Sequence, residues 1–266
     1  MLFSINLSFS QQNLITELIG EKYTYKDFNL KSNAELMIVG RAYKVAMGSV
    51  PYEYKHYTFN TYGNLISEIT SKNKSTINKE KEKTFTYDSN NRLKRINVME
   101  KSILTEQYFI NYNEKNQLAN IIYRETNTTT KLIYKIDWNK DKAVKYLLTD
   151  ENGTVLYESF KHEYDKNNNL IRYNFNEEGD LGNSVNSYNE VGLKTSEAHS
   201  YTNDASYNFK INYTYNKAYD MLTKSEDDLT IDYEYKTFDT HNNWTEMWYN
   251  EYSSSYRTYR TITYFE

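Results

Sequence analysis

Residues 162–170 read His-Glu-Tyr-Asp-Lys-Asn-Asn-Asn-Leu, and most of the chain is organised around copies of this phrase. An aromatic residue closes an alternating stretch, Asp and Asn follow, and Leu opens the next alternating stretch. Alternation of apolar and polar residues predicts a strand with one buried face. A short run of Asp and Asn between two strands predicts a hairpin turn with a left-handed position. Each copy of the phrase therefore predicts one β-hairpin.

The phrase recurs every 23 to 28 residues along the 266-residue chain. The aromatic that precedes Asp or Asn stands at Phe59, Tyr87, Tyr112, Trp138, Tyr164, Tyr188, Tyr215 and Phe238. A period in this range is typical of repeat architectures, and a lone hairpin is only marginally stable in water. We therefore expect an all-β fold of stacked β-hairpin repeats, about eight units of roughly 26 residues. They would form one long antiparallel sheet that is twisted, curved or spiralling.

The composition favours a thin sheet over a thick core. Apolar residues make up only 38% of the chain, yet aromatics reach 16%, with 29 Tyr. Disordered chains are poor in aromatics, whereas Tyr favours half-exposed strands. The net charge is −4 with both signs interspersed, so no basic block indicates nucleic acid, and no apolar run is long enough to span a membrane. Without cysteine, disulfides and thiolate metal sites are excluded.

The chain divides into three predicted regions. Residues 1–11 have the short apolar stretch and small serines of a signal-peptide remnant, which predicts export to the periplasm, the cell surface or the medium. The alternative is a strand, because Phe3, Ile5, Leu7 and Phe9 alternate with polar residues. Residues 12–51 are expected to form N-terminal capping strands, notably at 21–28 and 35–44, with a short helix over 13–20 as an alternative. Residues 52–266 form the repeat array.

The phrase in its best copies, residues 85–93 and 162–170, reads aromatic-x-Tyr-Asp-x-x-Asn-(Arg/Asn)-Leu, allowing His in the aromatic position. It resembles the tyrosine–aspartate (YD) repeat of the RHS repeat family. The C-terminal stretches 239–245 and 256–264 are similar to the close of small exported RHS-like proteins of Bacteroidetes-type bacteria. The resemblance covers roughly residues 52–266 and implies sheets of stacked hairpins that spiral. The autoprotease module and toxin tail of large members have no counterpart, so the resemblance implies a surface, scaffold or binding role.

No catalytic residue, metal site or cofactor is predicted. The four histidines, His56, His162, His199 and His241, form no close pair, and His162 and His241 are interpreted as solvated residues beside turns. Asp165 opens a segment that looks like a calcium loop. However, Leu170 stands where that loop needs Gly, and Asn176 stands where it needs Glu. A hairpin turn is the better interpretation.

The candidate ligand-binding residues are aromatic and lie near the C-terminus: Trp244, Trp248, Tyr249 and Tyr252. Such rings stack against sugar faces or anchor a protein partner. The alternative is that they pack within the terminal hairpin. Carboxylate pairs such as Glu177-Glu178 are expected to be solvated.

Three functions compete. The first is a non-enzymatic exported or cell-envelope repeat protein that presents a β-sheet surface to a protein or envelope partner. The second is a carbohydrate-binding module that uses exposed Tyr and Trp, and the third is a carboxylate-dependent hydrolase. Either binding function requires a protein or glycan partner and no nucleic acid.

Overall fold

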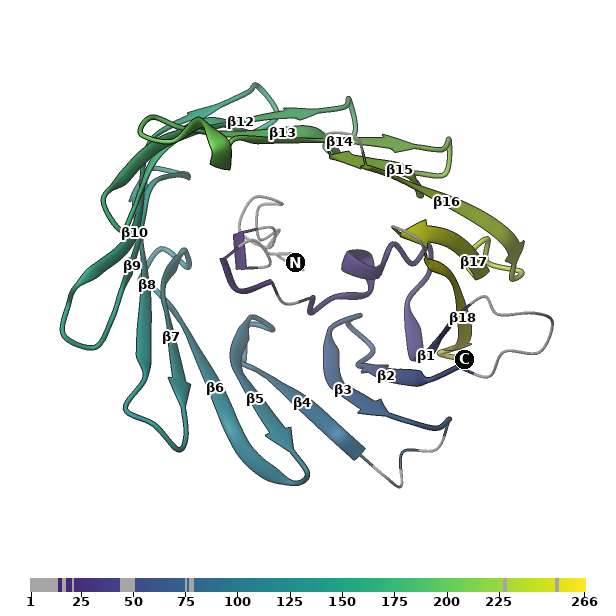
Figure 1. The fold of residues 1–266 in the computed structure, drawn as a ribbon. Coiled ribbons are helices and arrows are strands. Elements are labelled where there is room, and N and C mark those ends of the chain that lie inside the picture. The colour runs from purple at the N-terminus through teal and green to yellow at the C-terminus, as the bar shows by residue number, and fades with distance from the viewer. Residues whose placement is uncertain are drawn as a thin grey trace, which may run out of the picture. The chain divides into compact units, whose positions relative to one another are not determined.

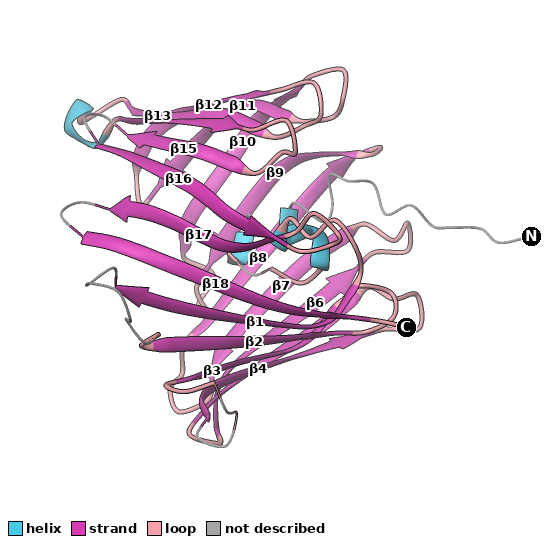
Figure 2. Ribbon diagram, turned by 90° about the vertical axis from the view of Figure 1, so that its right-hand side faces the viewer, coloured by secondary structure: helices cyan, strands magenta, loops and turns pink. Residues whose placement is uncertain are grey.

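The computed structural model describes residues 14–15, 18–20, 22–43, 51–74, 76, 79–226, 229–251 and 254–266. The prediction for residues 1–11 and the candidate Tyr252 fall outside this part of the chain. The described residues are almost entirely strand and loop (Figure 2). Short helical pieces occur at residues 14–15 and 18–19 and in the 3₁₀ helices η1 (Tyr25–Phe28) and η2 (Ala205–Tyr207). The expected all-β, antiparallel class is confirmed.

The strands are β1 (Ala34–Tyr43), β2 (Glu53–Phe59), β3 (Leu65–Ser71), β4 (Lys79–Tyr87), β5 (Leu93–Glu100), β6 (Ile103–Tyr112), β7 (Leu118–Glu125), β8 (Lys131–Asn139), β9 (Lys142–Thr149), β10 (Val155–Tyr164), β11 (Leu170–Glu177), β12 (Asp180–Tyr188), β13 (Lys194–Tyr201), β14 (Phe209–Tyr215), β15 (Met221–Glu226), β16 (Leu229–Phe238), β17 (Trp244–Glu251) and β18 (Ser254–Tyr264). The eight repeat phrases fall at the turns between β2 and β3, β4 and β5, and so on to β16 and β17.

The prediction of one long twisted, curved or spiralling sheet was wrong. β1 pairs with β2, so that Leu36 lies opposite Thr58, and it also pairs with β18, so that Ala34 lies opposite Tyr264 (Figure 1). The hydrogen-bonded order of the described strands, 18 in one antiparallel sheet, thus closes on itself at β1. Closure pairs the N–H and C=O groups that a free edge would expose. The repeats reveal the hairpins but give no local signal for a pairing between the two ends of the array.

The turns follow the predicted chemistry. Asp165 Oδ1 accepts the backbone N–H groups of Asn167 and Asn169 at 2.8 and 2.9 Å, and Asn168 has φ 65°. Among the described residues, eight turns share this arrangement, in which the first residue accepts from positions two and four further on and the third residue further on is left-handed. Seven belong to copies of the phrase and begin at Asn60, Asp88, Asn113, Asp165, Asn189, Asn216 and Asp239, and the eighth begins at Asp150 between β9 and β10. Asx turns of this kind offset unpaired backbone donors with a local side chain.

The aromatic residue of the phrase links its hairpin to the preceding one through a hydrogen bond to a backbone carbonyl. Tyr87 Oη donates to the carbonyl of Leu65 at 2.8 Å, and Tyr188 Oη donates to that of Leu170 at 3.2 Å. In the copy that carries Trp138, the indole Nε1 donates to the Leu118 carbonyl at 2.7 Å. Tyr and Trp are therefore interchangeable at this position, because each combines an apolar body with a hydrogen-bond donor.

The chain forms two compact units. Unit 1 comprises Met1–Glu21 and Tyr108–Ile211, and unit 2 comprises Lys22–Gln107 and Asn212–Glu266. The boundaries fall within β6 and β14. Within the described residues, no helix is long and apolar enough to cross a membrane.

Residues 25–28 of unit 2 form η1 instead of the expected strand. Asp27 Oδ2 accepts the backbone N–H groups of Tyr23 and Thr24 at 3.0 and 2.8 Å, which closes a capping box at the start of η1. Phe28 then packs its ring against Tyr57 and Phe59 of β2, with centroids 4.5 and 5.7 Å away. A local side-chain acceptor thus outweighed the strand preference of the neighbouring tyrosines.

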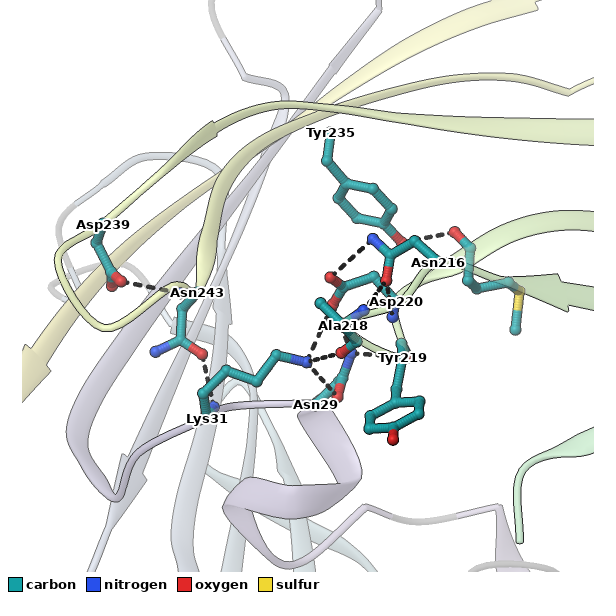
Figure 3. A network of polar contacts seen from close by, with 10 residues as sticks. Asn29, Lys31, Asn216, Ala218, Tyr219, Asp220, Tyr235, Asp239 and Asn243 are labelled. Carbon is teal, nitrogen blue, oxygen red and sulfur yellow. Dashed lines mark hydrogen bonds and ion pairs between the residues drawn. The ribbon is translucent and has the colours of Figure 1, made fainter. Parts of the chain in front are cut away.

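A polar network holds the segment after η1 against two repeat turns of unit 2 (Figure 3). The Asp220 carboxylate, only 1% exposed, accepts from Asn29 Nδ2 at 2.6 Å and forms an ion pair with Lys31 Nζ at 3.4 Å. The backbone N–H of Lys31 donates to Asn243 Oδ1 at 2.6 Å. These contacts attach the N-terminal part of unit 2 to the β14–β15 and β16–β17 turns.

Candidate functional site

Three tyrosines lie side by side across the last strands of unit 2. Tyr233 of β16 is opposite Tyr249 of β17, which is opposite Tyr256 of β18. The ring centroids are 5.6 and 5.0 Å apart, and the second pair is stacked at an interplanar angle of 18°. Because side chains alternate along a strand and cross-strand partners share a face, all three project from one face, called the cavity face below.

The cavity face of unit 2 contains a hollow of 370 Å³. Its lining comes from five neighbouring strands and consists of Ile231, Tyr233, Met247, Tyr249, Glu251, Thr258, Val39, Arg41, Glu53 and Lys55. The volume lies within the range of small-ligand sites, roughly 300–1,000 Å³. The hollow combines aromatic rings, aliphatic side chains and charged groups of both signs.

Arg41 connects the tyrosines to the charged part of the lining. Its guanidinium carbon lies 4.7 Å from the ring centroid of Tyr256 and 5.5 Å from that of Tyr249. One terminal nitrogen lies 3.6 Å from Glu251 Oε2. Lys55, across the hollow on β2, forms an ion pair of 3.7 Å with Glu68. The lining itself holds equal numbers of the two charges, with Arg41 and Lys55 as cations and Glu53 and Glu251 as carboxylates.

The tyrosine hydroxyls of the hollow remain protonated at neutral pH. Burial raises the pKa of Tyr249 to about 12; Glu251 also raises it, and Arg41 opposes the rise. Burial likewise raises the pKa of Tyr233. A protonated phenol both donates and accepts hydrogen bonds. The described lining thus offers flat apolar faces together with donors and acceptors, and none of its members is a Ser, Cys or His nucleophile.

The structure separates the aromatic residues that the sequence groups together. Tyr249 lies in the hollow. Trp244 is only 6% exposed, and the Arg260 guanidinium carbon lies 3.4 Å from its ring centroid. Trp248 projects from the opposite face of β17, where Lys236 Nζ and the Arg257 guanidinium carbon each lie 4.4 Å from its ring centroid. Because side chains alternate along a strand, the neighbours Trp248 and Tyr249 project from opposite faces of β17.

Most of the lining could not be found from the sequence. Arg41, Glu53 and Lys55 come from β1 and β2, far from the C-terminal aromatics along the chain. Only the pairing of β1 with β18 brings them to the same hollow. Tyr233 stands in an alternating strand and could have been identified as a cross-strand partner of Tyr249 once the hairpin register was known.

The interpretation of His162 as a solvated residue was wrong. His162 Nε2 lies 2.9 Å from Ser159 Oγ, and Nδ1 lies 2.9 Å from the Ala143 carbonyl. The carbonyl can only accept, so Nδ1 carries the proton and Ser159 donates to Nε2. Burial lowers the pKa of His162. Lys161, with φ 56° at a β-bulge, brings positions 159 and 162 to one face.

This Ser–His pair is structural because Ser159 is fully buried, with 0% exposure, and no substrate can reach its hydroxyl. Of the other histidines, His56 is buried at 5% exposure, whereas His241 is exposed and stacks on the Tyr264 ring at 3.8 Å. Among the described residues, no three His, Cys, Asp or Glu side chains are grouped so that they could hold a metal ion.

No protein-family model matches the sequence, and no curated protein matches it. Solved structures give distant similarities of fold. A porin-like protein from Bacteroides uniformis matches 87% of this chain and 97% of its own, with 9% identity and a TM-score of 0.44. A TcdB2-TccC3-Cdc42 structure matches 85% of this chain but only 16% of its own, with 9% identity and a TM-score of 0.41. TcdB2-TccC3 without its hypervariable C-terminal region matches 80% of this chain and 14% of its own, with 10% identity and a TM-score of 0.34. Similarities at these TM-scores carry no information about the role of any residue.

Proposed function

We propose that this protein is a non-enzymatic glycan-binding protein and that the tyrosine-lined hollow of unit 2 holds the sugar. The observation that supports this most is the row Tyr233, Tyr249 and Tyr256 beside Arg41 and Glu251. Export, which the N-terminal residues and the RHS resemblance predict, would bring such a protein into contact with extracellular or envelope glycans.

A sugar needs two kinds of contact, and the hollow offers both. The C–H groups on one face of a sugar ring pack against an aromatic face, as Tyr233 and Tyr249 would allow. The hydroxyl groups around the ring donate to carboxylates and accept from guanidinium or ammonium groups. Glu53 and Glu251 supply acceptors, and Arg41 and Lys55 supply donors. Their balanced charge favours a neutral ligand over an ionic one.

The test is a glycan array followed by titration calorimetry with the best glycan and the full chain. We expect Tyr249→Ala and Glu251→Gln each to weaken binding about tenfold, which corresponds to about 1.4 kcal/mol. Trp248→Ala is the matched control, because it removes the adjacent aromatic from the other face of the same strand, and it should change binding less than about twofold.

Absence of any glycan binder would overturn the proposal. So would an equal loss of affinity in Trp248→Ala and Tyr249→Ala, because that result would place the sugar outside the hollow. Circular dichroism of each variant separates loss of the site from loss of the fold. Turnover of the bound glycan would instead favour a hydrolase.

A second candidate is an interaction protein that presents its turns to a protein partner. In unit 2, the turn residues Tyr62 and Tyr219 are 75% and 50% exposed. Exposed tyrosines are common anchors in protein interfaces. Photo-crosslinking to an envelope extract should then yield a discrete product that disappears in Tyr62→Ser and persists in Tyr249→Ala. The reverse pattern would exclude the turns as the contact.

A further inference from the structure

Unit 1 contains a second cavity, of 490 Å³, with a different lining. The lining residues come from β8 to β13 and from the helical N-terminal residues of the unit: Leu14, Leu18, Tyr134, Tyr146, Leu147, Leu148, Tyr157, Leu170, Tyr173, Glu177, Asn186, Lys194 and Glu197. The volume is again that of a small-ligand site.

One part of this cavity is apolar. Leu14, which is only 3% exposed, and Leu18 line it from the helical N-terminal residues of the unit. On the sheet, Leu148 of β9 lies directly between Tyr134 of β8 and Tyr157 of β10. Burial raises the pKa of both tyrosines, which keeps their rings uncharged. This part suits a hydrocarbon or aromatic body that leaves water.

The charged members of the lining all come from β11 and β13. Lys194 Nζ lies 2.9 Å from Glu197 Oε2, so these two charges compensate one another. Glu177 Oε2 accepts the Tyr201 hydroxyl at 2.8 Å, a bond that leaves its negative charge in place. Two carboxylates and one ammonium give the lining one excess negative charge.

We propose that the unit 1 cavity binds an amphipathic amine, with its apolar body among Leu148, Tyr134 and Leu14 and its ammonium group facing Glu177. The excess carboxylate attracts a cation, and the faces of neutral tyrosine rings attract it further. A ligand of the same length with a carboxylate head group is repelled by the like charges of Glu177 and Glu197. This site is separate from the proposed glycan site and does not depend on it.

Titration calorimetry with octylammonium and octanoate tests the proposal, because the two probes differ only in the head group. For the full chain near neutral pH, we expect one octylammonium per protein, bound at least about tenfold more tightly than octanoate, or about 1.4 kcal/mol. Glu177→Gln should reduce that preference to less than about threefold while leaving the apolar contact intact.

A substitution that fills the cavity with a larger side chain provides the second test. Leu148→Trp should abolish saturable binding of both probes, whereas Leu181→Trp, the same substitution at a position that is 47% exposed, should leave it unchanged. Equal affinity for the two probes, an unchanged preference in Glu177→Gln, or more than one equivalent bound would each overturn the proposal. Glu177→Gln keeps the test decisive even if Leu148→Trp does not fold.

Discussion

The cavities of unit 1 and unit 2 are built on the same repeat but differ in chemistry. Both present tyrosines from one face of adjacent antiparallel strands. In unit 2, two cations and two carboxylates surround them, whereas in unit 1 leucines adjoin them and one negative charge is in excess. The turns and their aromatic anchors vary little from copy to copy, whereas the residues in mid-strand differ. The repeat provides the β-sheet scaffold, and the mid-strand residues between the turns determine what each cavity can bind.

The difference extends to packing around the cavities. Near the unit 1 cavity, Phe175 is only 1% exposed and contacts the rings of Tyr157, Tyr173, His199 and Tyr201 with centroids 5.1–6.3 Å away. In unit 2, Tyr249 is only half-buried. The first aromatic cluster is part of a core, and the second forms the wall of an open site.

The largest expected effect comes from removing the centre of the unit 1 cluster. Phe175→Ala should lower the free energy of unfolding by about 3–5 kcal/mol, because it leaves a cavity among rings that cannot collapse. Tyr249→Ala should cost about 1–2 kcal/mol, since its half-buried ring is partly replaced by water. Urea unfolding of both variants checks the difference. Equal losses would show that the two clusters are packed alike.

A pair of glycines gives a finer test of the same contrast. At Gly182 in unit 1, a Cβ would meet the Phe175 ring and the Ser200 carbonyl oxygen, the latter at 2.6 Å. At Gly40 in unit 2, it would meet only side-chain atoms of Pro51 and Tyr54, at 3.1–3.3 Å. Gly182→Ala should therefore cost about 1–3 kcal/mol and Gly40→Ala less than about 1 kcal/mol, measured by urea unfolding. The opposite order would place the tighter packing in unit 2.

The smallest expected effect concerns pH. Burial lowers the pKa of His162 and of His199, both in unit 1. The unfolded histidines, with a pKa of about 6.5, take up protons that the native state resists. Stability should therefore fall as pH drops from about 7.5 to about 5.5 and should not change above that window.

His162→Gln should make this loss of stability smaller, and the double variant with His199→Gln should make it smaller again. Comparing each variant with itself at the two pH values cancels any constant cost of the substitution. This pH window lies above the pH range in which turn carboxylates such as Asp165 take up protons. Burial tends to raise the pKa of Asp165, but hydrogen bonds from Asn169 and Asn167 hold it lower. An unchanged pH dependence in the double variant would contradict the assignment.

The sequence predicts what is local and misses what is distant or irregular. The turn at Asp165 was predictable because its donors lie two and four residues further on. The environment of His162 was not, because the bulge at Lys161 breaks the alternation on which face assignment relies. Of the unit 2 hollow, the C-terminal aromatics indicated only Tyr249. Arg41 and Glu53 join it through the pairing of β1 with β18, which no spacing in the sequence reveals.

The position of β1 between β2 and β18 also determines the order in which its two strand pairings can form during synthesis. Hairpins form quickly because they join residues close in sequence. The pairing of Ala34 with Tyr264 joins residues far apart along the chain and therefore forms later. During synthesis, β1 can pair with β2 early, but its other edge stays open until β18 has emerged. An open strand edge is a template for other chains. The nascent protein is therefore most prone to aggregation at this edge before β18 is synthesised, and pairing of β18 with β1 ends that interval.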